Sequence, residues 1–410
     1  MAELRIDRAR LVEWASRAIE TPSFTGSEQE LAELVAQTFA DMGLQVQWQQ
    51  IEEGRANVLG TRPGSGGGPS LMFNGHLDTS YSGKEAWLAH VPGFQPRAFV
   101  EDGRLYGLGI SNMKGALACY VEALRALDEA GIQLRGDVLI AAVSGEIEKS
   151  QWADAQGAEF RGYAAGTRYL VTHGGVADMC ILGEPTASKL VLGHFGSLWL
   201  RISTQGDFIH TAFTEGKRDR NSILRMRDVL DAVLAWIPSW EGDASNSYRG
   251  TSAVVNVSGI DGGFGWRVSR TPHRTDLFLD VRVPPTKEMA TARGEVLELV
   301  RTLERRFPEH GVEGEVYVTA PGAEIDEGHQ LIAALDDAHA EVFGAPPERD
   351  VTRWFSDASA LTRYGVPTVN YGTSTGLLDT VKGENLEIDG LAKTAEVYAR
   401  AAMKICGVAG

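Results

Sequence analysis

Residues 71–80 read LMFNGHLDTS, and the interpretation of the whole chain starts from this stretch. The apolar run Leu71-Met72-Phe73 leads into Asn74-Gly75, a pattern that predicts a buried strand with polar side chains at its carboxyl end. His76 and Asp78 follow, and residues two apart share one face of an extended segment. A carboxylate beside a histidine can fix the ring tautomer and make the ring a better metal ligand. Taken alone, the pair is also compatible with a solvated strand end.

The composition is that of a large globular protein. The chain has 410 residues, of which 43% are hydrophobic and 23% charged, so two domains are expected. The formal net charge of -16 argues against nucleic acid or an anionic membrane as a partner, because both bind basic surfaces. The three cysteines stand at unrelated spacings, which indicates neither a disulfide framework nor a thiolate metal site. Without a signal-peptide pattern or a bilayer-length apolar run, we expect a cytoplasmic protein.

Strand and helix patterns alternate in both terminal parts of the chain, and a different pattern lies between them. Apolar runs predict buried strands at 71–73, 137–143, 179–182 and 366–371, with helical periodicity between them. The middle of the chain follows a βαββαβ-like order. We predict a three-layer αβα domain with a mostly parallel sheet, made of residues 1–191 and 319–410, and an inserted ferredoxin-like α+β domain at 192–318 that forms a homodimer.

Polar residues follow two more of the predicted strands. Ser144-Gly145-Glu146-Ile147-Glu148-Lys149 comes after one apolar run, and Gly183-Glu184-Pro185-Thr186 after another. A glutamate just beyond a buried strand is well placed for chemistry, because ligands bind at the carboxyl ends of parallel strands. Ser111-Asn112 stands where a glycine-rich stretch meets a predicted helix. There the alternative is a helix cap, since either side chain can accept from free backbone N–H groups.

The order of these motifs resembles the co-catalytic metallopeptidase family of acetylornithine deacetylase, succinyl-diaminopimelate desuccinylase, aminoacylase and carboxypeptidase G. The motifs are GHLDT at 75–79, Gly-x-Gly-x-x-Asn-Met-Lys-Gly at 107–115, Gly-Glu at 145–146, GEPT at 183–186 and SDAS at 356–359. Together they span essentially the whole chain. The resemblance implies the two-domain fold described above and a metal-dependent hydrolase of C–N bonds.

The resemblance also implies a metal site from which some ligands are missing. Family members hold a first metal at the positions of His76, Asn112 and Glu184, and a second at Asn112, Ile147 and Asp379. Ile147 cannot bind a metal, and a neutral Asn112 lacks the charge that offsets repulsion between two cations. We therefore expect one divalent transition metal per subunit, manganese, zinc or iron. Glu148 and Asp379 are further candidates, either as ligands or as groups that orient a ligand.

Catalytic roles follow from the same resemblance. Glu146 stands at the position of the general base, which would accept a proton from the attacking water. Asp78 would orient His76. His210 matches a histidine that reaches an active site, often that of the partner subunit, and stabilises developing negative charge.

The substrate is expected to be a small molecule that carries a carboxylate. Arginine offers a bidentate fork for such a group, and aromatic side chains can line an apolar slot. The candidates are Arg267, Arg270, Arg353 and Trp266. Two reactions fit: hydrolysis of N-acyl amino acids by a one-metal amidohydrolase, or deamination of an activated aromatic amine such as a nitroanthranilate. A third hypothesis is an inactive binding scaffold, but the joint retention of a base and a ligand set argues against it.

Overall fold

The computed structural model describes residues 4–373 and 382–410, which form two compact units. The first unit comprises the described residues up to Gly193, Glu324–Asp350, and those from Ser356 onward. The second unit comprises His194–Ala323 and Val351–Phe355. Three of the four boundaries fall within strands: β8 (Leu190–His194), β15 (Ala323–Glu324) and β16 (Arg349–Thr352). Asp379 lies outside the described residues.

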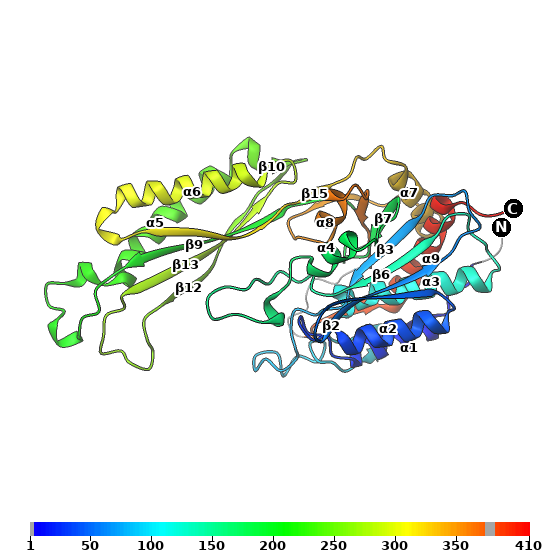
Figure 1. Ribbon diagram of the computed structural model, residues 1–410, viewed down its shortest axis with the longest axis horizontal. Helices are drawn as coiled ribbons and strands as arrows, with labels where there is room; N and C mark the ends of the chain where they lie inside the picture. Colours follow the sequence, from blue (N-terminus) through cyan, green and yellow to red (C-terminus); the bar gives the residue numbers. More distant parts are fainter. Residues whose placement is uncertain (1–3, 374–381) are drawn as a thin grey trace. The chain divides into compact units, whose positions relative to one another are not determined.

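The first unit is built on a mixed sheet, which has nine strands among the described residues. Its spatial order is β1 (Gln45–Glu52), β2 (Arg55–Arg62), β6 (Val138–Val143), β3 (Leu71–His76), β7 (Met179–Leu182), β17 (Thr368–Asn370), β8 and β15, with β16 on β8. The centre, β6-β3-β7-β17, is parallel, whereas the β1-β2-β6 and β17-β8 pairs are antiparallel. Figure 1 shows β6, β3 and β7 side by side. The predicted fold class is confirmed.

The central strands are buried along their whole length. Every residue of β3 and of β6 is buried, as expected for strands covered on both faces of a sheet. The helices of this unit are α1 (Arg8–Glu20), α2 (Gln29–Asp41), α3 (Gly115–Glu129), α4 (Ala165–Thr172), α7 (Gln330–Phe343), α8 (Ala358–Arg363) and α9 (Ile388–Cys406). Helix α9 packs on α3 and α7, and α2 packs on β2. Aromatic residues from β3, α3 and α9 stack together in the core: Phe73, Tyr120 and Tyr398.

A small three-stranded sheet supports the glycine-rich stretch before α3. It consists of β18 (Asn385–Glu387), β5 (Arg104–Tyr106) and β4 (Phe99–Glu101). The chain then passes through the short segment η1 (Ile110–Lys114) into α3. This order places residue 112 between a sheet strand and a helix start, where its backbone is held from both sides.

The second unit has its own sheet and core. Its elements follow one another as β9 (Gly196–Gln205), α5 (Ser222–Glu241), β12 (Val255–Gly262), β13 (Arg274–Val283), α6 (Met289–Arg306) and β14 (Glu313–Ala320). The strands form an antiparallel sheet in the order β12-β13-β9-β14. Successive residues of β13 alternate between buried and partly buried, because the helices cover one face of this sheet.

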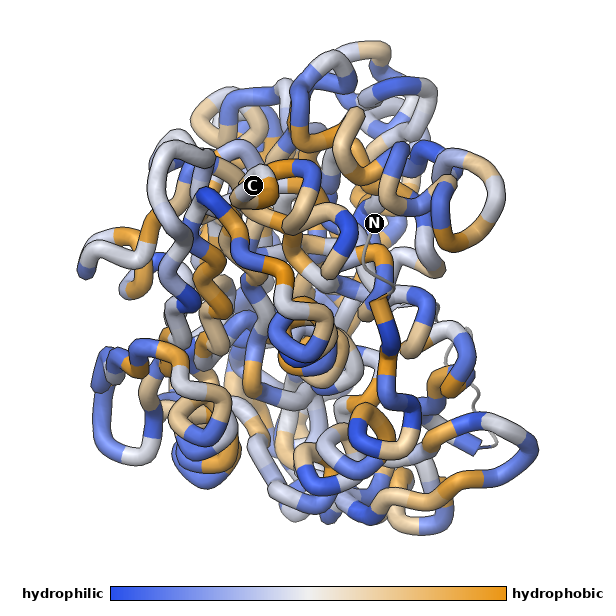
Figure 2. Tube along the Cα trace, turned by 90° about the vertical axis from the view of Figure 1, so that its right-hand side faces the viewer, coloured by the Kyte–Doolittle hydropathy of each residue, from blue (hydrophilic) through white to orange (hydrophobic). Residues whose placement is uncertain are grey.

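Hydrophobic and hydrophilic residues alternate along much of the trace in Figure 2. Helix α1 illustrates the pattern, since Leu11, Trp14, Ala15, Ala18 and Ile19 form its buried stripe. None of the helices in the described part of the chain combines the length and the apolar character needed to cross a bilayer.

Candidate metal centre

Three side chains meet at the carboxyl ends of the central strands. His76 ends β3, Glu146 follows β6 and Glu184 follows β7. The Nε2 atom of His76 lies 3.9 Å from Oε2 of Glu146 and 3.8 Å from Oε1 of Glu184. The three ligand atoms lie within 4.8 Å of one another, and all three residues are buried. The parallel pairing of β3 with both β6 and β7 brings these ends to the same edge of the sheet.

Asn112 completes the constellation from η1. Its Oδ1 lies 2.9 Å from Nε2 of His76. Its side chain does not cap α3, because the N-cap of this helix is Lys114 and no side chain caps it. Of the two sequence interpretations of Asn112, the geometry therefore supports a place in the site.

The neighbourhood of Asn112 is fixed by two buried ionisable groups, Glu384 and Lys114. A carboxylate oxygen of Glu384 accepts from the backbone N–H of Ser111 at 3.1 Å and of Asn112 at 3.4 Å. The Nζ of Lys114 donates to the carbonyls of Ala18 and Thr21 at 2.8 and 2.9 Å. Sequence reasoning gave Glu384 no role, because it lies 272 residues from Asn112 and belongs to no motif.

The tautomer of His76 follows from its contact with Asp78. Nδ1 of the ring lies 2.8 Å from the backbone carbonyl oxygen of Asp78 and 3.5 Å from its Oδ1. A carbonyl oxygen only accepts, so in the neutral ring Nδ1 carries the proton and Nε2 presents its lone pair to Asn112, Glu146 and Glu184. The carbonyl of Asp78 is thus the closer partner of the ring.

The charges of the centre favour a bound cation. Burial tends to lower the pKa of His76, but the hydrogen bond with Asp78 and the charges of Glu184 and Glu146 together raise it well above its ordinary value. Burial raises the pKa of Glu184 to about 7, against the opposing effect of His76. Burial, reinforced by Glu184, raises the pKa of Glu146 well above its ordinary value. Buried acids with such pKa values hold protons that a divalent cation can replace.

The donor set could hold a metal ion. Oε1 of Glu184 is buried and has no hydrogen-bond partner among the described residues, which is costly unless a ligand satisfies it. Two ligands of one ion, each about 2.1 Å from it, can be at most about 4.2 Å apart. The 2.9 Å from His76 to Asn112 and the 3.8 Å from His76 to Glu184 both satisfy this limit. One imidazole and two oxygen donors suit manganese, iron or zinc.

The position that the resemblance assigns to a second metal lacks a donor side chain at residue 147. Ile147 follows Glu146 directly, is 8% exposed and has no donor atom in its side chain. In the described part of the chain, one group of histidine, cysteine and acidic residues is close enough to hold an ion, and it is the group of His76, Glu146 and Glu184. Glu148 contributes at longer range, because its negative charge raises the pKa of Glu184.

Asp357 is a fourth buried acid near the centre, and sequence reasoning assigned it no role although it lies within the SDAS motif. It is 1% exposed, and neither carboxylate oxygen has a hydrogen-bond partner in the described structure. Burial raises its pKa to about 7, and its charge in turn raises the pKa values of Glu146 and Glu184. The motif was the available signal, but it did not show that this side chain would be buried beside the other two acids.

His210 lies in the second unit, before the short helix η3 (Thr211–Phe213). Its Nδ1 accepts a hydrogen bond from the backbone N–H of Ala212 at 3.2 Å, and its backbone forms an isolated bridge with Arg270. The guanidinium of Arg270 lies 5.6 Å from the centre of the Phe208 ring. The predicted roles of His210 and Arg270 toward substrate stay predictions.

The other substrate-binding candidates also belong to the second unit. Trp266 is 80% exposed, and its ring lies 5.7 Å from that of Phe264. Nε of Arg353 donates to the carbonyl of Ser252 at 2.7 Å. Arg267 lies one residue from Trp266 in the same exposed segment. Their predicted contacts with a substrate stay predictions.

Comparisons with known proteins agree with this geometry. A profile described as Peptidase family M20/M25/M40 matches residues 72–404. The chain belongs to this family. Curated succinyl-diaminopimelate desuccinylases from Alkalilimnicola ehrlichii and Gluconobacter oxydans are 26% and 28% identical to this M20 chain. The alignments cover 97% and 81% of this chain and 99% and 80% of those proteins.

Solved structures show the same fold over the whole M20 chain. The aminopeptidase PepT from Bacillus cereus superimposes with a TM-score of 0.76 at 20% identity, covering 98% of this chain and 99% of that one. The dipeptidase Dug1p from Saccharomyces cerevisiae gives 0.77 at 11% identity, with coverages of 97% and 96%. The predicted family and the predicted class of metal-dependent hydrolase acting on C–N bonds are confirmed.

Proposed function

We propose that this protein is a one-metal amidohydrolase that cleaves the amide bond of N-acyl amino acids. The observation that carries the proposal is the asymmetry of the centre. Donor atoms of Asn112 and Glu184 lie 2.9 and 3.8 Å from Nε2 of His76, whereas Ile147, at the position that the resemblance assigns to a second-metal carboxylate, has a buried side chain without a donor atom. A single divalent cation beside these donor atoms would polarise the scissile carbonyl and acidify the attacking water.

Glu146 is the proposed general base. Its Oε2 lies 3.9 Å from Nε2 of His76, so the carboxylate is next to the proposed ligands and within reach of a water bound there. Glu146 takes one proton from this water as the oxygen attacks the carbonyl carbon. The proton then passes to the nitrogen as the C–N bond breaks, and the products are a carboxylic acid and an amine. The raised pKa of Glu146, caused by burial and by Glu184, suits a group that must both take and return a proton.

The substrate class rests on the relatives and on the second unit. The curated relatives are named succinyl-diaminopimelate desuccinylases, so N-succinyl amino acids are the first amides to test. Arg267, Arg270 and Arg353 are proposed to bind the substrate carboxylate, since a guanidinium offers two parallel donors. Trp266 is proposed as an apolar wall, and His210 as the group that stabilises developing negative charge. A homodimer through the second unit is part of the proposal.

Metal analysis combined with a substrate panel tests this function. The purified protein is loaded separately with manganese, zinc and iron, and its metal content per chain is measured. Hydrolysis of N-succinyl and N-acetyl amino acids is followed by the released amine. We expect about one metal per chain and amine release from at least one acylated amino acid. Two metals per chain would contradict the one-metal centre. Ammonia release from an aryl amine, or no turnover with any metal, would contradict the amidohydrolase.

A further inference from the structure

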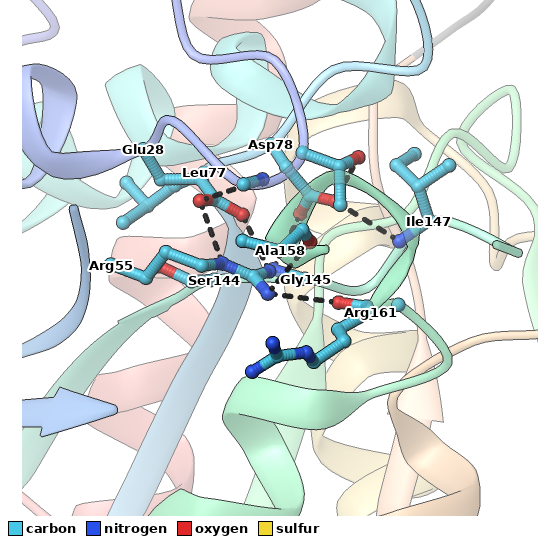
Figure 3. A network of polar contacts seen from close by, with 12 residues as sticks. Glu28, Arg55, Leu77, Asp78, Ser144, Gly145, Ile147, Ala158 and Arg161 are labelled. Atoms are coloured by element: carbon cyan, nitrogen blue, oxygen red, sulfur yellow. Dashed lines mark hydrogen bonds and ion pairs between the residues drawn. The ribbon is translucent and has the colours of Figure 1, made fainter. Parts of the chain in front are cut away.

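The carboxylate of Asp78 is bound mainly by the loop that carries Glu146. Its Oδ1 accepts from the backbone N–H groups of Gly145 and Glu146, both at 3.0 Å. Its Oδ2 accepts from the N–H of Ile147 at 3.2 Å and from the hydroxyl of Thr25 at 3.0 Å. Figure 3 shows the Asp78 carboxylate directed at this backbone. One buried acid thus fixes three successive amides, and the middle one belongs to Glu146.

Arg55 lies on the other side of the same loop. Its Nε and one Nη form a bidentate pair with the carboxylate of Glu28, at 2.9 and 2.8 Å. The second Nη donates to Glu52 at 2.9 Å and to the carbonyls of Arg161 and Ala158 at 3.0 and 3.2 Å. Figure 3 shows this guanidinium between Glu28 and Arg161. All three nitrogens of the Arg55 guanidinium therefore donate to groups that surround the loop.

The segment that Arg55 binds is itself attached to the base loop. The N–H of Tyr163 donates to the carbonyl of Ile147 at 3.1 Å, and the N–H of Ala165 donates to that of Gly145 at 3.0 Å. The loop therefore leaves β6, passes Glu146 and returns alongside itself before α4. Through the carbonyls of Ala158 and Arg161, Arg55 holds this returning segment in place.

Gly145 shows how closely Arg55 packs on the loop. Its φ is +74°, in the left-handed region that glycine adopts without strain. A Cβ atom at this position would lie 2.2 Å from an Nη of Arg55. The guanidinium thus fills the space over Gly145, the residue immediately before Glu146.

A buried ion pair such as Arg55–Glu28 contributes little net stability. The side chains of Arg55 and Glu28 are 1% and 0% exposed, and the desolvation of a buried ion pair offsets much of its attraction. Burial raises the pKa of Glu28 to about 7, even though Arg55 acts in the opposite direction. The benefit of such a pair is a defined position for the groups around it.

We propose that Arg55 is a positioning residue for Glu146. Held by Glu28, the guanidinium packs against Gly145 and fixes the loop on one side, while Asp78 fixes it on the other, so that the carboxylate of Glu146 is directed toward His76 and Glu184. The inference rests on the proposed role of Glu146 as general base.

The test compares Arg55→Lys with a matched control on the same strand. Arg62, at the other end of β2, is 11% exposed in its side chain, pairs with Asp128 at 2.7 Å and donates to the carbonyl of Ile132 at 2.8 Å. Lysine keeps the charge at either position but loses the planar fork. For Arg55→Lys we expect kcat to fall about 10- to 100-fold with KM and metal content within about twofold of wild type. For Arg62→Lys we expect kcat within about twofold of wild type.

Hydrogen exchange supplies a readout that does not depend on turnover. The amides of residues 145–147 are expected to exchange at least about tenfold faster in Arg55→Lys than in wild type or Arg62→Lys. Wild-type kcat and wild-type protection in Arg55→Lys would overturn the proposal. So would a lower melting temperature with unchanged kcat, since that is a purely structural effect.

The exchange result also separates this inference from the proposed function. If no amide substrate is found, faster exchange at 145–147 alone still supports the positioning role, and unchanged exchange rejects it. If Arg55→Lys does not fold, Glu28→Gln replaces it, because it removes the charge that holds the guanidinium while leaving Arg55 in place. We expect the same direction of change in kcat and in exchange, with a smaller size.

Discussion

The two halves of the metal centre differ in side-chain chemistry but share one backbone framework. One half keeps an imidazole, an amide oxygen and a carboxylate, with Asn112 and Glu184 lying 2.9 and 3.8 Å from His76. The other half has Ile147, whose side chain is apolar and buried, yet its N–H still donates to Asp78 at 3.2 Å. The comparison shows that a loop without a donor side chain at residue 147 can still be held by hydrogen bonds from three successive backbone amides to one carboxylate.

Removal of a ligand from the first half should have the largest effect. His76→Ala or Glu184→Ala is expected to abolish stoichiometric metal binding and to lower kcat/KM on the order of 10³-fold or more. The measurement is elemental analysis after dialysis, together with the rate of amine release. The matched control is His339→Ala, because His339 is a buried histidine of the same unit that bonds to the hydroxyl of Tyr371. Full metal content in His76→Ala would show that His76 is not a metal ligand and would contradict the proposed first half of the centre.

Loss of the general base should lower the rate without loss of the metal, unlike loss of a metal ligand. Glu146→Gln is expected to lower kcat about 10²- to 10⁴-fold with about one metal retained per chain, because the amide keeps the shape but cannot take a proton. Metal content and kcat are measured on the same preparation. Simultaneous loss of the metal would instead make Glu146 a ligand.

Carboxylates introduced at residues 112 and 147 test whether the second half lacks only its ligands. The double variant Asn112→Asp, Ile147→Glu supplies a charged bridge and a second carboxylate, and we expect it to take up a second metal measurable by titration calorimetry. Without metal, the buried glutamate should lower the free energy of unfolding by about 2–4 kcal/mol. Ile147→Gln with Asn112→Asp is the matched control, since it has the same size without the charge. Equal metal uptake by both double variants would argue against the carboxylate as the missing element.

The smallest effect is expected at Asp357, whose charge acts on both Glu146 and Glu184. Its pKa is about 7 in the folded protein against an ordinary value of 3.8, so between these pH values the folded protein holds a proton that the unfolded chain has lost. Stability of the metal-free protein should therefore fall as the pH rises through this window, because the unfolded state binds fewer protons. In Asp357→Asn this decline should be weaker, and at pH 8 the variant should be more stable by about 1–3 kcal/mol.

Denaturant unfolding of the chelator-treated protein from about pH 4 to 8 measures this difference. The exposed Asp154 provides the control variant Asp154→Asn, for which we expect a pH dependence like that of wild type. A uniform loss of stability in Asp357→Asn at every pH would show that its carboxylate is needed for packing or for a bond in its charged form.

Local patterns predicted the parts of the fold that depend on neighbouring residues. The apolar runs at 71–73, 137–143 and 179–182 became parts of the buried strands β3, β6 and β7, because a strand covered on both faces is mostly apolar. The polar residues after these runs therefore gathered at one edge of the sheet. Helix α9 spans Ile388–Cys406, one residue longer than the periodicity at 389–406 indicates.

Tertiary contacts between distant segments could not be predicted in the same way. The bidentate pair of Glu28 and Arg55 joins a helix start to a strand, and nothing in either local pattern identifies the partner. Glu384 reaches Ser111 across 273 residues of sequence. Asp357 begins a short helix, and its burial among other acids depends on the packing of β7, β17 and α8. Strands β4 and β5 lie in a stretch whose prolines and glycines hide any alternation.

Asp78 links the position of His76, the proposed ligand, to that of Glu146, the proposed base. Its backbone carbonyl sets the ring of His76, and its carboxylate sets the amides on either side of Glu146. We expect a displacement of the end of β3 to move the imidazole and the base loop together, because Asp78 is bound to both. The 3.9 Å between His76 and Glu146 should then change less than the distance from either residue to segments that Asp78 does not contact.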